Sequence, residues 1–445
     1  CAHCNALHFK GERLVRSGIR NPRFGMCCLQ GKISLPLLPE PPNTLRKLLM
    51  DPSTRSRNFR TQIRQYNSAF AFTSVALKLD ENLLNRSGPY SFRLHGALSH
   101  RMGSLLPDDG QQPSYAQLYI HDPQAALATR SLRNPNLDHT ILTELQAMLH
   151  EVNPYVPLYK QAYEILHDKP PDEQANISAR IVVEPNTDHR RYNMPLVDEV
   201  AAVIPGSGEE VTREHRDIIV WLRGGHLQRI SHLNPVYSPL HYILMFSHGE
   251  QGWHTKIPVT GDPDQRTRSP WVSQRCYYAY RLHPRILEPD TIFRCGRLFQ
   301  QYVVDAWASI ETSNLHWVRT HQKDIRADTY QGIRDAVNNA DVNPDLAQQG
   351  TRIILPSTHS GSARHMYQLF QDSMSICRHC RKPDLFLTMT ANPNWPEIQQ
   401  ALLELDHPIG NDPNNPPKRQ TAADRPDIVA RVFNQKKNAL LKEIK

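Results

Sequence analysis

The chain has 445 residues, 39% of them hydrophobic and 22% charged, so it can form two or three domains with cores of their own. Its formal net charge of +8 favours a polyanionic partner, because lysine and arginine side chains that neutralise phosphates release counterions. Eight cysteines are too few for a disulfide framework in a chain of this length, and no apolar run reaches the roughly 18 residues of a membrane span. We therefore expect a soluble, intracellular protein that does not enter membranes.

The first residues have a cysteine pattern that is typical of a zinc site. Thiols and imidazoles gather within the first thirty positions, at Cys1, Cys4, Cys27, Cys28, His3 and His8. Two thiolates on one knuckle, closed by a second pair, meet the tetrahedral requirement of structural zinc. Because adjacent residues rarely both ligate one ion well, His3 or His8 is an alternative to one member of the second pair. The other interpretation is an end of the chain with ordinary buried cysteines.

The elements that follow mix strands and helices. Prolines close this head, and a short amphipathic helix follows it near residue 50, where we place a module boundary. From Phe59 to about Leu106, short apolar runs separated by turn signals predict strands. Apolar spacing predicts a helix from residue 139 and, after Pro154 and Pro157, a second helix to about residue 166. Further strands are predicted near 177–185 and 217–223. Residues 235–275 predict an irregular, aromatic-rich stretch.

The remaining chain is mostly helical by its pattern. An apolar stripe predicts one long helix or a helical hairpin over about 297–338, and another helix follows residues 360–362. The segment 383–398 switches from strand to turn to helix, with Asn394 near the cap and Pro396 in the first turn. A basic helix over 426–445 has no stop signal, as expected for a truncated gene product.

Two further groups of side chains do not amount to predicted sites. Cys377-x-x-Cys380 favours structural burial over a metal role, because Cys377 lies on the apolar face of its helix and no partner pair is near. No regular element brings together His241, His248, Glu250 and His254, and we assign them no catalysis. The sequence also lacks a G-x-x-x-x-G-K-[ST] loop, a G-x-S-x-G elbow and an H-E-x-x-H pair.

Ten collinear segments resemble the N-terminal region of Helitron Rep-helicase transposases, including their helicase-like domain. Among them are CxxC-NALHF, LHEVNPYVPLYKQA, SPLHYILMFSHGEQGW, ILPSTHSGSARHMYQLFQDSM and KPDLFLTMTANPNWPEI. In that family a zinc-finger-like head binds DNA, a nuclease of the HUH class nicks single-stranded DNA, and a helicase unwinds it. The segment FLTMTANPNW is similar to the first nuclease motif. With the basic helix that follows, it implies DNA contacts at Phe386, Thr388, Thr390, Asn392, Trp395, Arg431, Lys436 and Lys437.

The sequence departs from the family after that segment. The chain has no His-hydrophobic-His motif, no paired catalytic tyrosines and no helicase, so we predict no catalytic residues. A divalent catalytic metal is expected only if the missing nuclease motif were present. The predicted partner is DNA, single-stranded or from the transposon ends, and the predicted location is the nucleus.

The resemblance implies a multi-domain α+β architecture. Its parts are a zinc-finger-like head over 1–50, a Helitron-specific α+β region over 51–350 and an incomplete HUH-type domain over 351–445. Two alternatives stay open. One is a degenerate transposon relic or a host-recruited interaction protein. The other is an endonuclease that uses histidines outside the usual motif, with His359, His365 or His407 converging on Thr388 or Thr390.

Overall fold

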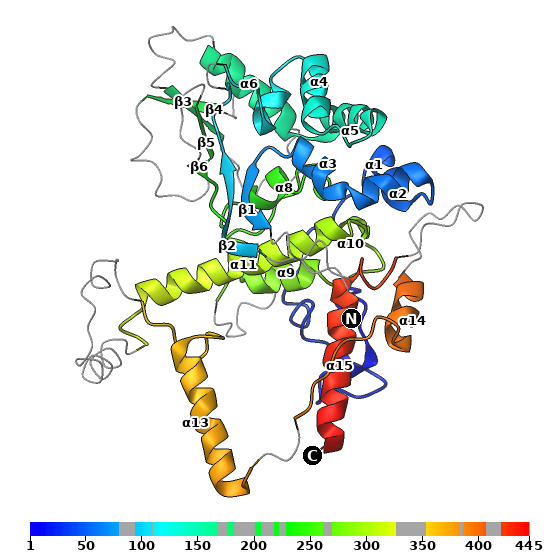
Figure 1. The fold of residues 1–445 in the computed structure, drawn as a ribbon, viewed down its shortest axis with the longest axis vertical. Coiled ribbons are helices and arrows are strands. Elements are labelled where there is room, and N and C mark those ends of the chain that lie inside the picture. The colour runs from blue at the N-terminus through cyan, green and yellow to red at the C-terminus, as the bar shows by residue number, and fades with distance from the viewer. Residues whose placement is uncertain are drawn as a thin grey trace. The chain divides into compact units, whose positions relative to one another are not determined.

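The computed structural model describes the residues 1–79, 94–107, 110–167, 177–181, 201–205, 218–221, 228–260, 269–325, 353–382, 386–405 and 420–444 (Figure 1). The chain divides into two compact units, one formed by Cys1–Ala306 with Ala391–Lys445 and the other by Trp307–Thr390. Many helices and small antiparallel sheets agree with the predicted α+β class. None of the described helices is both long and apolar enough to cross a membrane. These units do not test the predicted domain boundaries near residues 50 and 350, which stay predictions.

The first unit begins its helical part with α1 (Asn43–Met50), α2 (Thr54–Thr61) and α3 (Ile63–Phe70). The prediction of strands from Phe59 onward is wrong up to residue 70. Phe59, Ile63, Tyr66 and Phe70 recur at helical spacing, and all four are buried. These residues therefore form the buried faces of α2 and α3, although the short apolar runs resembled strands in composition.

Strands begin after α3. β1 (Ser74–Leu79) pairs antiparallel with β2 (Leu94–Met102), with a register shift between Ala76 and Lys78, and β2 also pairs with β6 (Gln228–Arg229). A second sheet has the order β4-β3-β5, from β3 (Ile177–Ile181), β4 (Ala201–Pro205) and β5 (Ile218–Trp221). The strands predicted near 177 and 217 are confirmed, and the structure adds β4 between them.

Three helices lie between the strands of the two sheets in the sequence. A 3-10 helix, η3 (Tyr115–Tyr119), precedes α4 (Pro123–Arg133), α5 (His139–Val152) and α6 (Tyr155–His167). Carboxylates begin two of them, because Asp122 and Asp138 accept bonds from the first free N–H groups of α4 and α5. The predicted helical pair is confirmed, but the second helix begins at Tyr155, so Pro157 lies in its first turn rather than before it.

A buried carboxylate connects the sheet of β1, β2 and β6 to the helices that follow it. These are α8 (Tyr237–His241), α9 (Gln274–Arg281), α10 (Thr291–Arg294) and α11 (Arg297–Thr320). The Asp305 carboxylate accepts the hydroxyls of Tyr237 at 2.9 Å and Tyr242 at 2.7 Å. His100 Nε2 lies 2.8 Å from the same group. Burial alone would raise the pKa of Asp305, but His100 and the Tyr242 hydroxyl hold it below its ordinary value.

The second unit contains the rest of α11 and α13 (Ala363–Cys380), whose N-cap Ser362 accepts the His365 N–H. No residue of α13 is buried, so the expected burial of Cys377 is wrong, and Cys380 is exposed. Nothing in the described residues fully covers the apolar face that carries Cys377. α11 is a single helix as far as Thr320, and residues 326–338 of the predicted helical stripe lie outside the described residues.

The end of the sequence returns to the first unit. The structure forms α14 (Pro396–Leu405) and α15 (Pro426–Ile444), as the sequence predicts. Their apolar faces share a small core of Ile398, Ala401, Leu402, Ile428 and Val432. The strand predicted before α14 is wrong, because residues 386–392 have no regular structure. A strand requires hydrogen bonds to a neighbouring strand, and no described strand pairs with this segment.

Removal of the Asp305 carboxylate tests the buried connection. Asp305→Ala should lower the free energy of unfolding by about 3–5 kcal/mol, because it leaves buried polar partners without their acceptor. Urea unfolding at pH 7 measures this loss. The control Asp372→Ala removes an exposed carboxylate from α13 and should change the stability by less than about 0.5 kcal/mol. Equal losses in the two variants would contradict a stabilising role of the network.

Candidate metal centre

The first knuckle is a tight turn that brings Cys1 and Cys4 together. The Asn5 N–H donates to the Cys1 carbonyl at 2.9 Å, and Asn5 adopts a φ of 56°. Asparagine is among the residues that tolerate this left-handed conformation best. The chain then continues as an extended segment whose Leu7 N–H donates to the Pro284 carbonyl at 2.9 Å. The knuckle is thus anchored to the turn that follows α9.

The second knuckle begins with the buried pair Cys27 and Cys28. Leu29, Gln30 and Gly31 all adopt positive φ angles, which reverses the chain directly after the pair. The Gly31 N–H donates to the Cys28 sulfur at 3.2 Å, and such a hydrogen bond favours the thiolate form of Cys28. A Cβ on Gly31 would lie 3.0 Å from the His3 ring, so both the φ of 92° and the close approach require glycine.

The four cysteine sulfurs form one compact group. Their Sγ atoms all lie within 4.8 Å of one another, with 3.7 Å between Cys1 and Cys28 and 3.9 Å between Cys27 and Cys28. Four thiolates at about 2.3 Å from a tetrahedral zinc ion stand about 3.8 Å apart. Among the described residues this is the only group of three or more cysteine, histidine or acidic side chains that could hold a metal ion.

The electrostatics of the group differ from one thiol to the next. Burial alone would raise the pKa of Cys4, but the Ala6 N–H, the neighbouring thiols and the positive charge of Arg285 hold it below its ordinary value. Burial, together with the neighbouring sulfurs of Cys28 and Cys4, raises the pKa of Cys27 to about 12. Burial also raises the pKa of Cys28. Four thiolates therefore require a cation between them, and a bound zinc ion would supply it.

The two predicted histidine ligands do not belong to this group. His3 is exposed and lies against Gly31, outside the cluster of sulfurs. His8 is turned toward another network, because its Nδ1 lies 2.9 Å from Glu12 Oε2 and its ring stacks on Phe24 with 4.1 Å between centroids. The structure thus brings together both adjacent cysteines, the pair that sequence reasoning doubted. The turn after Cys28 makes this possible.

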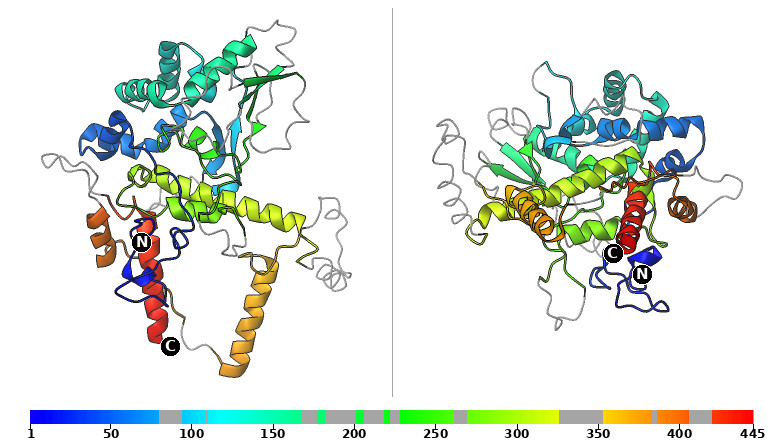
Figure 2. Two further views of the ribbon diagram at one scale, coloured as in Figure 1. Left: turned by 180° about the vertical axis from the view of Figure 1, so that it is seen from behind. Right: turned by 60° about the horizontal axis from the view of Figure 1, so that its bottom comes forward.

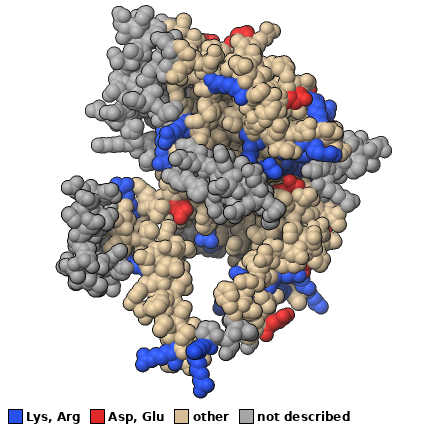
Figure 3. Space-filling model, in the orientation of Figure 1, with Lys and Arg blue, Asp and Glu red and all other residues tan. Residues whose placement is uncertain are grey.

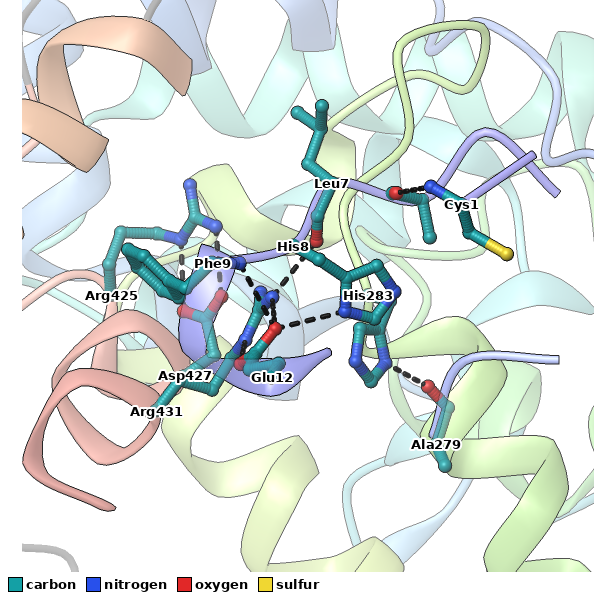
Figure 4. A network of polar contacts seen from close by, with 11 residues as sticks. Cys1, Leu7, His8, Phe9, Glu12, Ala279, His283, Arg425, Asp427 and Arg431 are labelled. Atoms are coloured by element: carbon teal, nitrogen blue, oxygen red, sulfur yellow. Dashed lines mark hydrogen bonds and ion pairs between the residues drawn. The ribbon is translucent and has the colours of Figure 1, made fainter. Parts of the chain in front are cut away.

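A partly buried polar network ties this head to α15 (Figure 4). Arg431 donates from Nε and Nη2 to the two Glu12 carboxylate oxygens, each at 2.7 Å, and from Nη2 to the Leu7 carbonyl at 2.9 Å. Its guanidinium lies over the Phe9 ring, 5.1 Å from the centroid. In both views of Figure 2, α15 runs beside the N-terminal segment. Residues 419 positions apart in sequence thus make one joint, which no local pattern could have predicted.

The residues predicted to contact DNA are spread over both units. Phe386, Thr388 and Thr390 are exposed in the second unit. In the first unit, Asn392 Oδ1 accepts the Asn394 N–H at 2.9 Å, and Trp395 lies under the Lys436 ammonium, 5.5 Å from the ring centroid.

The basic residues of this predicted set have different surroundings. Lys436 also bonds Glu397 at 2.7 Å, while Lys437 is exposed. Arg431 is half-buried and paired with Glu12, so its observed role is structural. DNA contacts by the other members of the set stay a prediction.

The histidines named for an alternative nuclease do not gather around the predicted motif in the described residues. His359 Nε2 lies 3.9 Å from Glu311 Oε1, and His365 Nδ1 lies 3.0 Å from the Ser357 carbonyl. His407 lies outside the described residues. His241, which was considered with His248 and His254, is the last residue of α8 and is buried. Burial together with nearby His100 lowers its pKa to about 3.

Comparison with known families identifies the second part of the chain. The model of the Helitron helicase-like domain at the N-terminus matches residues 277–445. No curated protein matches the chain. Residues 277–445 are thus similar to the Helitron helicase-like domain, and the resemblance drawn from the sequence is confirmed over this range. The matched range contains the support of the first knuckle, Pro284 and Arg285, and its partner helix α15.

Metal analysis of the purified chain tests the cysteine group. We expect one zinc per chain, and X-ray absorption should show sulfur ligands alone, at about 2.3 Å. His3→Asn and His8→Asn should keep this coordination, whereas Cys4→Ser should lose a sulfur ligand or the ion itself. A nitrogen ligand that disappears in His3→Asn would contradict the four-cysteine assignment.

The Glu12–Arg431 joint should make the stability depend on pH. Burial alone would raise the pKa of Glu12, but bonds from Arg431 and His8 lower it to about 2, below its ordinary value near 4.5. A depressed carboxyl pKa stabilises the fold above the ordinary value, and this contribution is lost as the pH falls from about 4.5 to 2.

Glu12→Gln should therefore cost about 1–3 kcal/mol at pH 7 and progressively less toward pH 2. Unfolding by urea at a series of pH values measures the difference. The control Glu404→Gln, on exposed α14 surface, experiences the same loss of metal in acid and isolates the contribution of Glu12. A constant difference between the two variants at all pH values would contradict this prediction.

Proposed function

We propose that the chain is the DNA-binding portion of a Helitron rolling-circle transposase, with a structural zinc ion in its head and no nuclease or helicase activity of its own. The observation that carries the proposal is the match of residues 277–445 to the Helitron helicase-like domain. In this proposal residues 351–445 correspond to the start of the HUH-type domain. The protein acts in the nucleus on single-stranded or transposon-terminal DNA.

The surface of the head supports a nucleic-acid partner. Between the knuckles, the Leu14 N–H donates to the Arg23 carbonyl at 2.9 Å and closes a loop. Arg16, Arg20 and Arg23 are exposed on it, and Val15, next to Leu14, is 98% exposed. Arginines can neutralise backbone phosphates, and apolar side chains beside them can contact bases. Glu12 is the single acidic residue between the two knuckles, and Arg431 neutralises it.

A salt series with single-stranded and duplex oligonucleotides tests the proposal. The zinc-loaded chain should bind single strands with an affinity that falls steeply with salt. The triple variant Arg16→Gln/Arg20→Gln/Arg23→Gln should lower the magnitude of the slope of log K against log salt by about 2–3, since each arginine neutralises about one phosphate.

The matched control Arg133→Gln/Arg275→Gln/Arg378→Gln removes three exposed arginines elsewhere and should keep the slope. Absence of both zinc and DNA binding in the wild-type chain would overturn the proposal in favour of the relic or interaction protein. Nicking of the oligonucleotide with Mg²⁺ or Mn²⁺ would instead favour the alternative endonuclease. Nuclear exclusion of a fluorescent fusion would contradict the proposed location.

A further inference from the structure

A pocket of about 230 Å³ lies in the first unit, and its lining does not include the four clustered cysteines of the head. It is lined by the end of α1, by α2, by the residues from the end of α10 to the start of α11, and by the segment before α15. Four of its lining residues are arginines, and one is acidic: Arg57, Arg60, Arg294, Arg297 and Asp424. In the face shown in Figure 3, lysine and arginine side chains gather over α1 and α2.

The arginines are held at different depths. Arg60 Nη1 donates to the Leu48, Leu49 and Asp51 carbonyls at the end of α1, at 3.2, 3.2 and 2.7 Å. Its Nε and Nη2 are shielded from solvent and have no hydrogen-bond partner among the described residues. Arg294 is buried and donates to Asp290 Oδ2 at 2.6 Å. Arg57 and Arg297 are exposed, so they can meet a ligand from solution.

Few carboxylates face this group among the described residues. Asp424 lines the pocket beside the four arginines, Asp290 accepts a bond from Arg294, and the charge of Asp51 acts on Arg60. Asp424 Oδ2 already accepts the Thr421 N–H at 2.9 Å and the Thr421 hydroxyl at 2.8 Å. Burial lowers the pKa of Arg60, and Arg57 and Arg294 lower it further against the opposing charges of Asp424 and Asp51.

The start of α11 adds to the positive potential. Gly296 and Arg297 line the pocket, and Arg297 is the first residue of this 24-residue helix. The N-terminus of a helix carries about half a positive charge, which acts over its first turn. Helix and side chains therefore favour the same kind of ligand, a compact anion.

We propose that this arginine pocket binds a phosphate group. Guanidinium groups bind phosphate through paired N–H donors, and about 230 Å³ is small for an organic cofactor but sufficient for a phosphate with part of its substituent. A phosphodiester of DNA and free inorganic phosphate present the same chemistry. Binding of DNA here rests on the proposed function, whereas binding of inorganic phosphate does not.

The two exposed arginines allow a test that leaves the fold intact. Arg57→Gln/Arg297→Gln is compared with Arg55→Gln/Arg319→Gln, which removes exposed charges from the same two helices outside the pocket. Inorganic phosphate, added at constant ionic strength, should raise the Tm of the wild type and the control but not that of the pocket variant. Calorimetric titration should show an affinity for phosphate at least about tenfold lower in the pocket variant. Without phosphate its Tm should stay close to that of the wild type, because both substituted side chains are exposed.

Single-stranded DNA in a salt series identifies the source of the phosphate. A slope of log K against log salt that falls by about 2 in the pocket variant alone would show that the pocket holds backbone phosphates. An unchanged slope with loss of the phosphate effect would support a free phosphate ligand. If the wild type bound phosphate at the pocket but no DNA, the proposed function would fail and the pocket would stand. Equal phosphate responses in the pocket variant and the control would overturn the inference.

Discussion

The buried carboxylate of Asp305 is the interaction on which the arrangement of the first unit depends. It accepts hydrogen bonds from Tyr237 and Tyr242, and His100 from β2 lies beside it, so three segments far apart in sequence share one charge. A charge in such a place requires partners, because an isolated carboxylate in a low-dielectric interior would be protonated or would draw in water. These bonds hold the first part of α11 against β2 and the segment around α8, and the beginning of α11 forms one wall of the arginine pocket.

The cysteine head is too small to bury a core of its own and depends on its neighbours. Its first knuckle hydrogen bonds to the turn after α9 through Leu7 and Pro284, and its 3-10 helix η1 (Lys10–Glu12) binds α15 through Glu12 and Arg431. Phe9 joins the core between α14 and α15. The head, the turn after α9 and the pair α14 and α15 therefore pack together in the first unit. A zinc ion at the cysteines would stabilise this joint as well as the head itself.

The arginines of this unit lie in two kinds of surroundings. Where arginines hold the fold together, they are paired, as Arg431 is with Glu12, Arg285 with Glu288 and Arg425 with Asp427. In the loop between the knuckles and in the pocket beside α11, arginines outnumber the carboxylates near them. This difference separates structural arginines from those available to a polyanion, and composition alone could not make it, since both kinds contribute equally to a net charge of +8.

The sequence by itself determined what depends on neighbours a few residues away. It placed α5, α6, α14 and α15, because caps, prolines and apolar spacing act over a few turns. It also identified the four cysteines and the family. Only the tertiary structure decided that residues 386–392 form no strand, that Cys27 and Cys28 both face the cluster, and that Glu12 binds Arg431. The pocket likewise joins Arg57 and Arg60 to Arg294 and Arg297 across more than half the chain. Such convergence depends on the packing of whole elements, which no local pattern of residues encodes.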